Sequence, residues 1–415
     1  MFKSILTLSA LSAACVASFA QGANTVTLYG IVDVGVQRVT GYAKGTDTAL
    51  VSGIMEGSRF GLRGNEDIGG GYRAIFTLEN RTEANTGSLS SRPPSGSQIP
   101  DRLNQAALLG LPGALQPAVS GVAAQIGSGI GVNLANNFWD RQAYVGLVTP
   151  FGAVLAGRQY TPAYEMNAAF DTMGTQSSLA AGQVASIPSS IDIRYSNALQ
   201  YRIVQGPISA ALMYAFGGVS GNNSANRLVG AFGMYRTTAF AAGIGYNQRN
   251  NDVGAKSLRS LVLGASAMVG PGKLSGMVVQ YKDDNPSGVS TIATSLTPLV
   301  GAAGAGLVQA AFTNALKQDG RLMHIGYKLE TGPNTFYVAY TGANDRRAAN
   351  ADVASYGVAY SYALSKRTDL NAVATHFNNK NLAQAAPGQA GFLGGVTASA
   401  GTDANSVAFG IRHRF

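Results

Sequence analysis

Cysteine, histidine and charge are all scarce in this 415-residue chain, and each shortage excludes a class of protein. The single cysteine, Cys15, lies in the apolar N-terminal run, so a chain cleaved after Ala20 has no thiol and no disulfide. Only three histidines occur, and none accompanies a nucleophile motif or a metal-ligand spacing. Charged residues make up 12% of the chain, which is low for an α/β enzyme of this length. We therefore expect no enzyme, no cofactor and no metal site.

Long apolar runs are also lacking. Beyond the N-terminus we identify no apolar stretch of about 18 residues, the length that a transmembrane helix needs. The N-terminus itself has a basic start at Lys3, an apolar run over 5–16 and small residues at Ser18 and Ala20. This pattern predicts an export signal that is cleaved after Ala20. The expected organisation is a signal peptide of residues 1–20 followed by one domain of residues 21–415.

Two further features lack the context that would give them a function. The glycine clusters at 127–131 and 301–306 do not follow a strand and open a helix, so we interpret them as flexible loops and not as phosphate loops. The sequence pI is about 9.6, but the arginines are dispersed along the chain instead of clustering on one face. We therefore expect no nucleic-acid partner.

Strict alternation of apolar and polar residues is the dominant pattern. In the final ten residues Val407, Phe409 and Ile411 share one face, and Arg412 and Arg414 share the other. Side chains of a strand point alternately to opposite faces, so the segment reads as a strand with one oily surface. Similar segments occur at 25–39, 55–64, 71–81, 139–149, 153–160, 197–204, 208–216, 227–235, 239–249, 258–269, 273–282, 321–330, 334–342, 354–364, 368–377 and 405–414. Sixteen such strands beside an export signal predict an all-β fold, a transmembrane antiparallel β-barrel.

The connections between these segments alternate in length. Short links rich in Gly, Pro, Asn and Ser separate every second pair of strands, as tight turns require. Long connections occupy residues 83–138, 161–196, 283–320 and 378–404. Short periplasmic turns on one rim and long extracellular loops on the other are typical of barrels in the outer membrane of Gram-negative bacteria. Because residues 83–138 contain apolar patches, we expect this loop to pack on the barrel mouth or on a neighbouring subunit.

The parity of the strands assigns their faces. In the segment 354–364 Tyr356, Val358 and Tyr360 alternate with Ser355 and Ala359. We expect the tyrosines to face the membrane, where aromatic side chains form a girdle at the interface.

Several segments resemble the signature segments of Gram-negative general porins. They are VTLYGIV at 26–32, SRFGLRGNEDIGGG at 58–71, RQAYVGL at 141–147, GRQYTP at 157–162 and the terminal GIRHRF. The resemblance implies a homotrimer of sixteen-stranded barrels that lets small hydrophilic solutes and ions diffuse passively. It also implies that the third extracellular loop, residues 161–196, folds into the lumen as a constriction loop.

Charged residues near mid-height are the candidates for the pore constriction. By strand parity and height we expect a basic wall formed by Arg59, Arg63, Arg73, Arg141 and Arg158. On the constriction loop, the candidate acidic residues are Glu165 and Asp171. We expect Glu79 to pair locally with an arginine of its own strand.

Charge also predicts the partners. Lysine and arginine outnumber aspartate and glutamate by 30 to 21, and a narrow passage with basic walls concentrates anions. We therefore predict a mild anion preference, together with contacts of the basic rims to outer-membrane lipid and lipopolysaccharide. Two alternatives remain open: a surface adhesin or receptor barrel whose long loops bind a partner, and a substrate-specific channel. No track of inward aromatic residues supports the substrate-specific channel.

Overall fold

The computed structural model describes residues 24–43, 45–88, 101–127, 137–174, 177–185, 190–388 and 395–415. The expected signal peptide, residues 1–20, lies outside these ranges.

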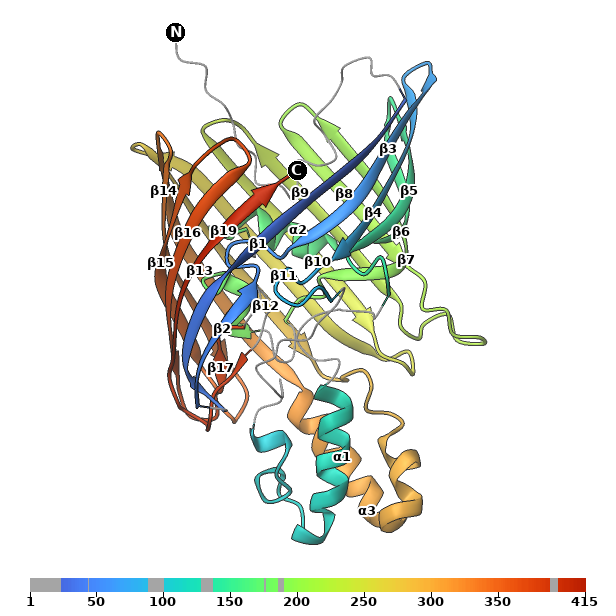
Figure 1. The fold of residues 1–415 in the computed structure, drawn as a ribbon. Helices are drawn as coiled ribbons and strands as arrows, with labels where there is room; N and C mark the ends of the chain where they lie inside the picture. Colours follow the sequence, from blue (N-terminus) through green and yellow to red (C-terminus); the bar gives the residue numbers. More distant parts are fainter. Residues whose placement is uncertain are drawn as a thin grey trace.

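A closed wall of antiparallel strands forms the body of the protein (Figure 1). The wall strands are β1 (Thr25–Tyr42), β2 (Gly45–Ser52), β3 (Arg59–Gly69), β4 (Tyr72–Arg81), β5 (Gln142–Thr149), β6 (Gly152–Tyr160), β7 (Arg194–Gln205), β8 (Ile208–Ala215), β9 (Leu228–Arg236), β10 (Phe240–Asn250), β11 (Lys256–Val269), β12 (Gly272–Asp283), β13 (Gln318–Thr331), β14 (Asn334–Asp345), β15 (Val353–Ala363), β16 (Thr368–Asn379) and β19 (Ala404–Arg414). Apart from β2 and β3, which both pair with β1, each wall strand pairs with the next wall strand in sequence, and β1 pairs with β19 from Ile31↔Arg414 to Thr40↔Asn405. This last ladder closes the sheet, so the predicted sixteen-stranded barrel is confirmed.

The second position of the wall is shared by two strands. β1 pairs with β2 over its C-terminal part and with β3 over its N-terminal part, so β2 and β3 together occupy one place in the barrel. Residues 53–58 leave the wall between them. The prediction of a continuous strand over 55–64 was therefore wrong at its start, and β3 also continues to Gly69.

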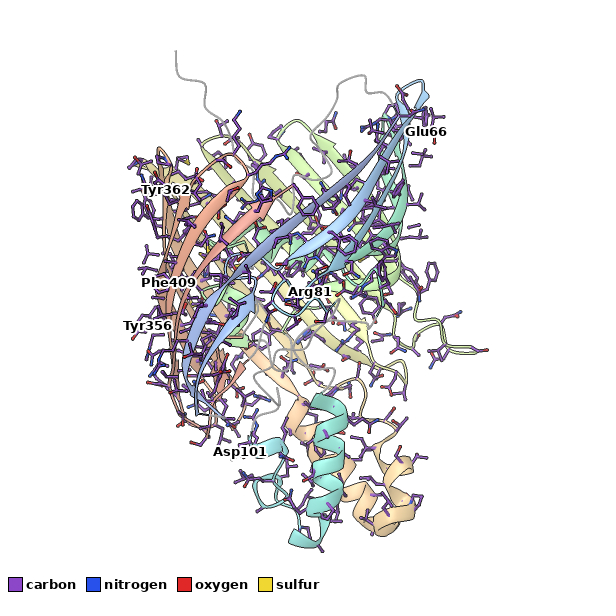
Figure 2. All side chains as sticks on the ribbon, viewed as in Figure 1. Glu66, Arg81, Asp101, Tyr356, Tyr362 and Phe409 are labelled. Carbon is purple, nitrogen blue, oxygen red and sulfur yellow. The ribbon has the colours of Figure 1, made fainter. Side chains whose placement is uncertain are left out.

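The predicted faces of the segment 354–364 are confirmed. Tyr356 and Val358 are exposed on the outer surface by 49% and 55%, whereas Ser355 and Ala359 on either side of them are buried. Tyr356, Tyr362 and Phe409 extend outward from the wall in Figure 2. Exposed apolar side chains are expected on the outer surface of a barrel that is surrounded by lipid.

The two rims differ as predicted, but the long loops carry helices that the sequence pattern did not reveal. α1 (Gln116–Gly127) and α3 (Ile292–Leu316) lie beyond the rim opposite the short turns (Figure 1). Their buried residues, with Leu115 just before α1, form one apolar cluster that also includes Val119, Val308 and Phe312. We call residues 101–127 and 284–317 the helical extension. The loop at 83–138 thus packs on another long loop.

α3 also corrects two predictions about its own segment. The glycines at 301–306 belong to this helix, which is interrupted only at Gly301, where φ is 72°. Among the described residues α3 is the one helix long and apolar enough, by length and composition, to cross a membrane. The statement that the chain lacks such a segment was therefore wrong.

The remaining regular elements are short. They are η2 (Asp101–Leu103), η3 (Ala107–Leu109), η4 (Gly113–Leu115), η5 (Ala181–Ala185), β17 (Ala385–Ala386) and β18 (Gly395–Val396).

Candidate functional site: the barrel lumen

One helix of the loop at 161–196 lies inside the barrel. α2 (Pro162–Phe170) contacts β9, β10, β11 and β12 from the lumen side (Figure 1). The helix begins after Thr161, whose hydroxyl accepts a hydrogen bond from the Tyr164 N–H at 3.4 Å, and Pro162 occupies its first turn. A capped start with proline in the first turn explains why a helix forms in a segment of only nine residues.

The wall behind α2 is made of glycine where the helix side chains need space. A Cβ atom added at Gly264 would lie 2.2 Å from Phe170, and one at Gly245 would lie 2.7 Å from Met166. Phe170 and Met166 are almost completely buried in this contact. α2 is therefore packed directly against the wall, where glycines leave room for its side chains.

Asp171 follows the last residue of α2, and its carboxylate binds backbone N–H groups of the same loop. Its carboxylate accepts hydrogen bonds from the N–H groups of Met173 at 2.8 Å and Ala181 at 2.9 Å. The next residue, Thr172, donates its N–H to Nε2 of His324 on β13 at 3.1 Å. The structure thus corrects the expectation that Asp171 presents its charge to the pore, because its carboxylate is buried where it closes the loop.

A network of charged side chains covers the wall facing α2. Glu79 on β4 accepts a hydrogen bond from Nε of Arg141 at 2.7 Å and lies 3.8 Å from Nε of Arg59 on β3. Arg141 and Arg194 also donate to the hydroxyl of Tyr160, at 2.8 and 3.1 Å. Glu79 therefore pairs with arginines outside its own strand. The expectation that it pairs with an arginine of its own strand was wrong.

The network continues in the other direction through Glu56, which lies between β2 and β3. Glu56 forms ion pairs with Arg59 at 2.9 Å, with Arg412 at 2.9 Å and with Arg414 at 3.0 Å. Arg412 and Arg414 then pair with Asp369 on β16 at 3.0 and 2.8 Å. We call the whole set the charge belt: Arg59, Arg141, Arg194, Arg412, Arg414, Glu56, Glu79 and Asp369.

Positive charge is in excess in the charge belt, with five guanidinium groups to three carboxylates. Burial alone would raise the pKa of Glu56, but Arg59, Arg412 and Arg414 together lower that pKa to about 2. Glu56 is therefore ionised at neutral pH. Nη1 of Arg59 is buried and has no hydrogen-bond partner within the described part of the chain.

Arg158 lies at a break in the regular pairing of β6 with β7. The register between β6 and β7 shifts after Gly157, whose φ is 137° and whose added Cβ would meet the Ala143 carbonyl oxygen at 2.2 Å. Such a bulge breaks the alternation of faces. Arg158 is buried and donates to the Asp140 carbonyl at 2.7 Å and to the Ser196 hydroxyl at 3.0 Å. It thus braces the wall beside the charge belt.

The other two predicted wall arginines, Arg63 and Arg73, are not members of the belt. Arg63 stacks on the ring of Tyr29 at 3.8 Å, and the Tyr29 hydroxyl donates to Glu79 at 3.0 Å. Arg73 contacts Asn65 at 3.3 Å and lies six residues before Glu79, or about 20 Å along the strand. Arg63 is therefore next to the belt, whereas Arg73 is near the short-turn rim.

Of the two predicted loop acids, Glu165 faces a wall arginine. Its carboxylate pairs with Arg202 on β7, and both side chains are largely buried. The guanidinium of Arg202 also lies over the ring of Phe232 at 5.4 Å. This pair ties α2 to the edge of the wall that carries the charge belt.

The sequence did not identify Glu56, Arg194, Arg202 or Asp369 as lumen residues. It also did not identify Arg412 and Arg414 as candidates for the pore wall. The alternation at the C-terminus already placed Arg412 and Arg414 on the face opposite the lipid-facing residues. Arg194 and Glu56 carried no such signal, because Arg194 lies in what the pattern assigned to a loop and Glu56 in what it assigned to a strand.

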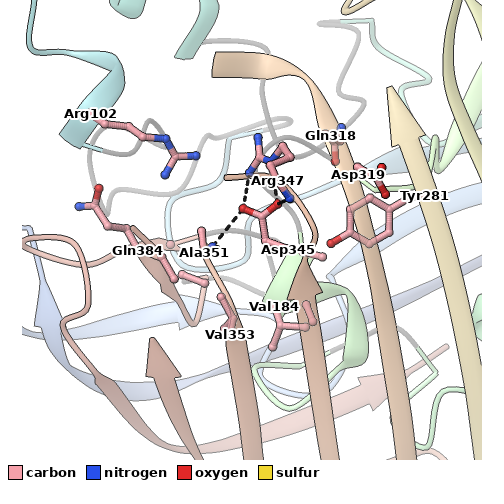
Figure 3. Close-up of a pocket in the computed structure, with 15 residues that line it drawn as sticks. Arg102, Val184, Tyr281, Gln318, Asp319, Asp345, Arg347, Ala351, Val353 and Gln384 are labelled. Atoms are coloured by element: carbon pink, nitrogen blue, oxygen red, sulfur yellow. Dashed lines mark hydrogen bonds and ion pairs between the residues drawn. The ribbon is translucent and has the colours of Figure 1, made fainter. Parts of the chain in front are cut away.

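A small pocket of about 80 Å³ lies at the long-loop rim (Figure 3). Asp345 and Arg347 form an ion pair of 2.7 Å on one side, and Arg102 lines the other. Arg102 donates to the Leu382 carbonyl at 2.8 Å, and burial followed by the proximity of Arg347 lowers its pKa to about 10. Arg102 therefore joins the helical extension to the barrel mouth. Within the described ranges no group of three or more metal-ligating side chains occurs.

Comparison with known proteins gives a consistent result. The family model described as Gram-negative porin matches residues 7–382. Outer membrane porin protein 32 of Delftia acidovorans is 28% identical over 433 residues, which cover 100% of both chains.

Solved structures share the fold. The anion-selective porin from Comamonas acidovorans superposes with a TM-score of 0.67 at 24% identity, covering 95% of this chain and 100% of that one. OmpT of Vibrio cholerae in its trimer form superposes with a TM-score of 0.56 at 12% identity, covering 95% of this chain and 100% of that one. At these identities the solved structures show a similar fold alone.

Proposed function

Because the chain belongs to the Gram-negative porin family, we propose that this outer-membrane channel, through which small hydrophilic solutes diffuse passively, prefers anions. The observation that carries the preference is the excess of guanidinium groups in the charge belt. The narrow passage would lie between this belt and α2. The anion selectivity named for the Comamonas porin agrees with this proposal.

The physical basis of the preference is the focusing of a fixed field. Low-dielectric walls around a narrow aqueous passage strengthen the potential of the charges that line it. An excess of positive charge raises the local concentration of anions and lowers that of cations.

A salt-gradient measurement tests the proposal. Arg414 is the most exposed belt arginine and Arg63 lies beside the belt, so both can lose their charge without leaving a buried carboxylate unpaired. In planar bilayers we expect R63Q with R414Q to lower the anion-to-cation permeability ratio by about twofold. R346Q, at an exposed rim position, should leave the ratio unchanged. If the double variant had the wild-type reversal potential, the proposal that arginines in and beside the charge belt set the selectivity would be refuted.

We also propose that the barrels assemble as homotrimers and that residues 1–20 are a cleaved signal peptide. The trimer form of OmpT, an outer membrane protein of Vibrio cholerae, supports the first proposal. Light scattering of the purified protein in detergent tests the homotrimer. The mass of the mature chain tests the cleavage of the signal peptide. The basic rims are further proposed to contact lipopolysaccharide phosphates, which a loss of binding at high salt would support.

A second candidate role, binding of an external partner, is favoured by the helical extension. Its apolar cluster is separate from the barrel and holds two long loops together beyond the rim. If an extension-deleted variant conducts like wild type, the two roles are separable, and surface binding of phage or host protein can be compared between the two forms.

A further inference from the structure

The break between β2 and β3 places a second inward segment in the barrel. Residues 53–58 leave the ladder, whereas β1 stays continuous past them. Ile54 and Met55 bury their side chains in a cluster with Leu179 and Ala180 of the 161–196 loop. The segment is therefore folded toward the lumen and packed against the constriction loop.

Asp33 on β1 holds this segment in place. Its carboxylate accepts hydrogen bonds from the N–H groups of Ile54 at 2.9 Å, Met55 at 2.8 Å and Glu56 at 2.8 Å. Ser58 adds two more contacts, because its hydroxyl accepts from the Asp33 N–H at 2.9 Å and donates to the Asp33 carbonyl at 3.0 Å. Asp33 and Ser58 are both buried, so these bonds fix the segment without access of water.

The fixed segment delivers one carboxylate to three arginines. Glu56 is held at 2.9 to 3.0 Å from Arg59, Arg412 and Arg414, which come from two different strands. Without Glu56 the only acidic partner of Arg412 and Arg414 in the charge belt is Asp369. The positive excess of the belt therefore depends on a residue that is outside both the barrel wall and the constriction loop.

We propose that Glu56 limits the anion selectivity of the channel, and that Asp33 and Ser58 are positioning residues that set this limit by holding the segment 53–58 inward. This inference rests on the proposed diffusion function and names a determinant of its selectivity. In physical terms, Glu56 cancels part of the field that the belt arginines impose on the passage.

The first test removes the charge at constant size. We expect E56Q to raise the anion-to-cation permeability ratio by about twofold, measured as a reversal potential under a salt gradient. The matched control is E330Q, which removes the same charge from an exposed position near a short turn. An unchanged ratio in E56Q, with a folded and conducting barrel, would overturn the proposal.

The second test addresses positioning without changing any formal charge. S58A removes the hydroxyl that joins the segment to Asp33, so Glu56 is held less firmly and the ratio should rise by a smaller factor than in E56Q. In the E56Q background the same change should have no further effect on the ratio, since there is then no charge to misplace. A shift of equal size in both backgrounds would show that Ser58 acts on the pore by another route. E56D, which keeps the charge, serves as the folding check.

The outcomes separate this inference from the proposed function. If wild type gives no conductance steps, the diffusion function fails. If wild type conducts with an anion preference and E56Q is indistinguishable from it, only the role of Glu56 fails.

Discussion

At the scale of single residues, Glu79 is a buried carboxylate with several charged or polar partners. Its side chain is 4% exposed and is paired with Arg141 at 2.7 Å and with Arg59 at 3.8 Å, while Tyr29 donates a third contact. Removal of one member of a buried ion pair leaves the partner charge without compensation. The stability of this wall therefore depends on Glu79 more than on any exposed pair.

We expect E79Q to lower the free energy of unfolding by about 3 kcal/mol, because Arg141 then remains buried without its carboxylate. The measurement is the urea midpoint of the detergent-solubilised barrel, followed by the loss of its folded band on gels. E330Q, whose ion pair with Lys328 is exposed, should change the midpoint little. A midpoint for E79Q equal to that of wild type would show that water compensates Arg141.

Single residues also mark where sequence reasoning succeeds. The two-residue period placed Tyr356 outward and Ser355 inward because every residue of a regular strand obeys the same alternation. The bulge after Gly157 is a local backbone event, so no pattern revealed how Arg158 is braced. Glu56 was assigned to a strand because its neighbours are apolar, although they are apolar in order to pack inside the barrel.

At the scale of elements, the position of α2 depends on missing side chains in the wall. Gly264 faces Phe170 so closely that an added Cβ would lie 2.2 Å away. G264A should therefore push α2 toward the charge belt and narrow the passage. We expect a lower single-channel conductance in planar bilayers. G233A is the matched control, because a Cβ there meets nothing within 4 Å, and equal conductance of the two variants would contradict the seating of α2.

Elements built from non-local contacts were the ones the sequence did not predict. α3 is rich in alanine and glycine and contains Pro298 and an interruption at Gly301, so it read as a flexible loop. Its stability comes from packing against α1, which is about 170 residues earlier in the chain, a separation that no local pattern reports. The wall strands needed no such partner to be recognised, because their period is local.

At the scale of the whole molecule, the barrel and the helical extension are stabilised separately. The barrel closes through its own continuous ladder, whereas the extension is held by a cluster in which α1 and α3 bury each other. Replacement of both helices by short Gly-Ser linkers should therefore leave folding and conductance close to wild type. Replacement of α1 alone exposes Val308 and Phe312 to water and should lower the refolding yield through aggregation. Refolding yield in detergent distinguishes these outcomes, and a single-helix variant that refolds better than the double one would show that the extension is not a cooperative unit.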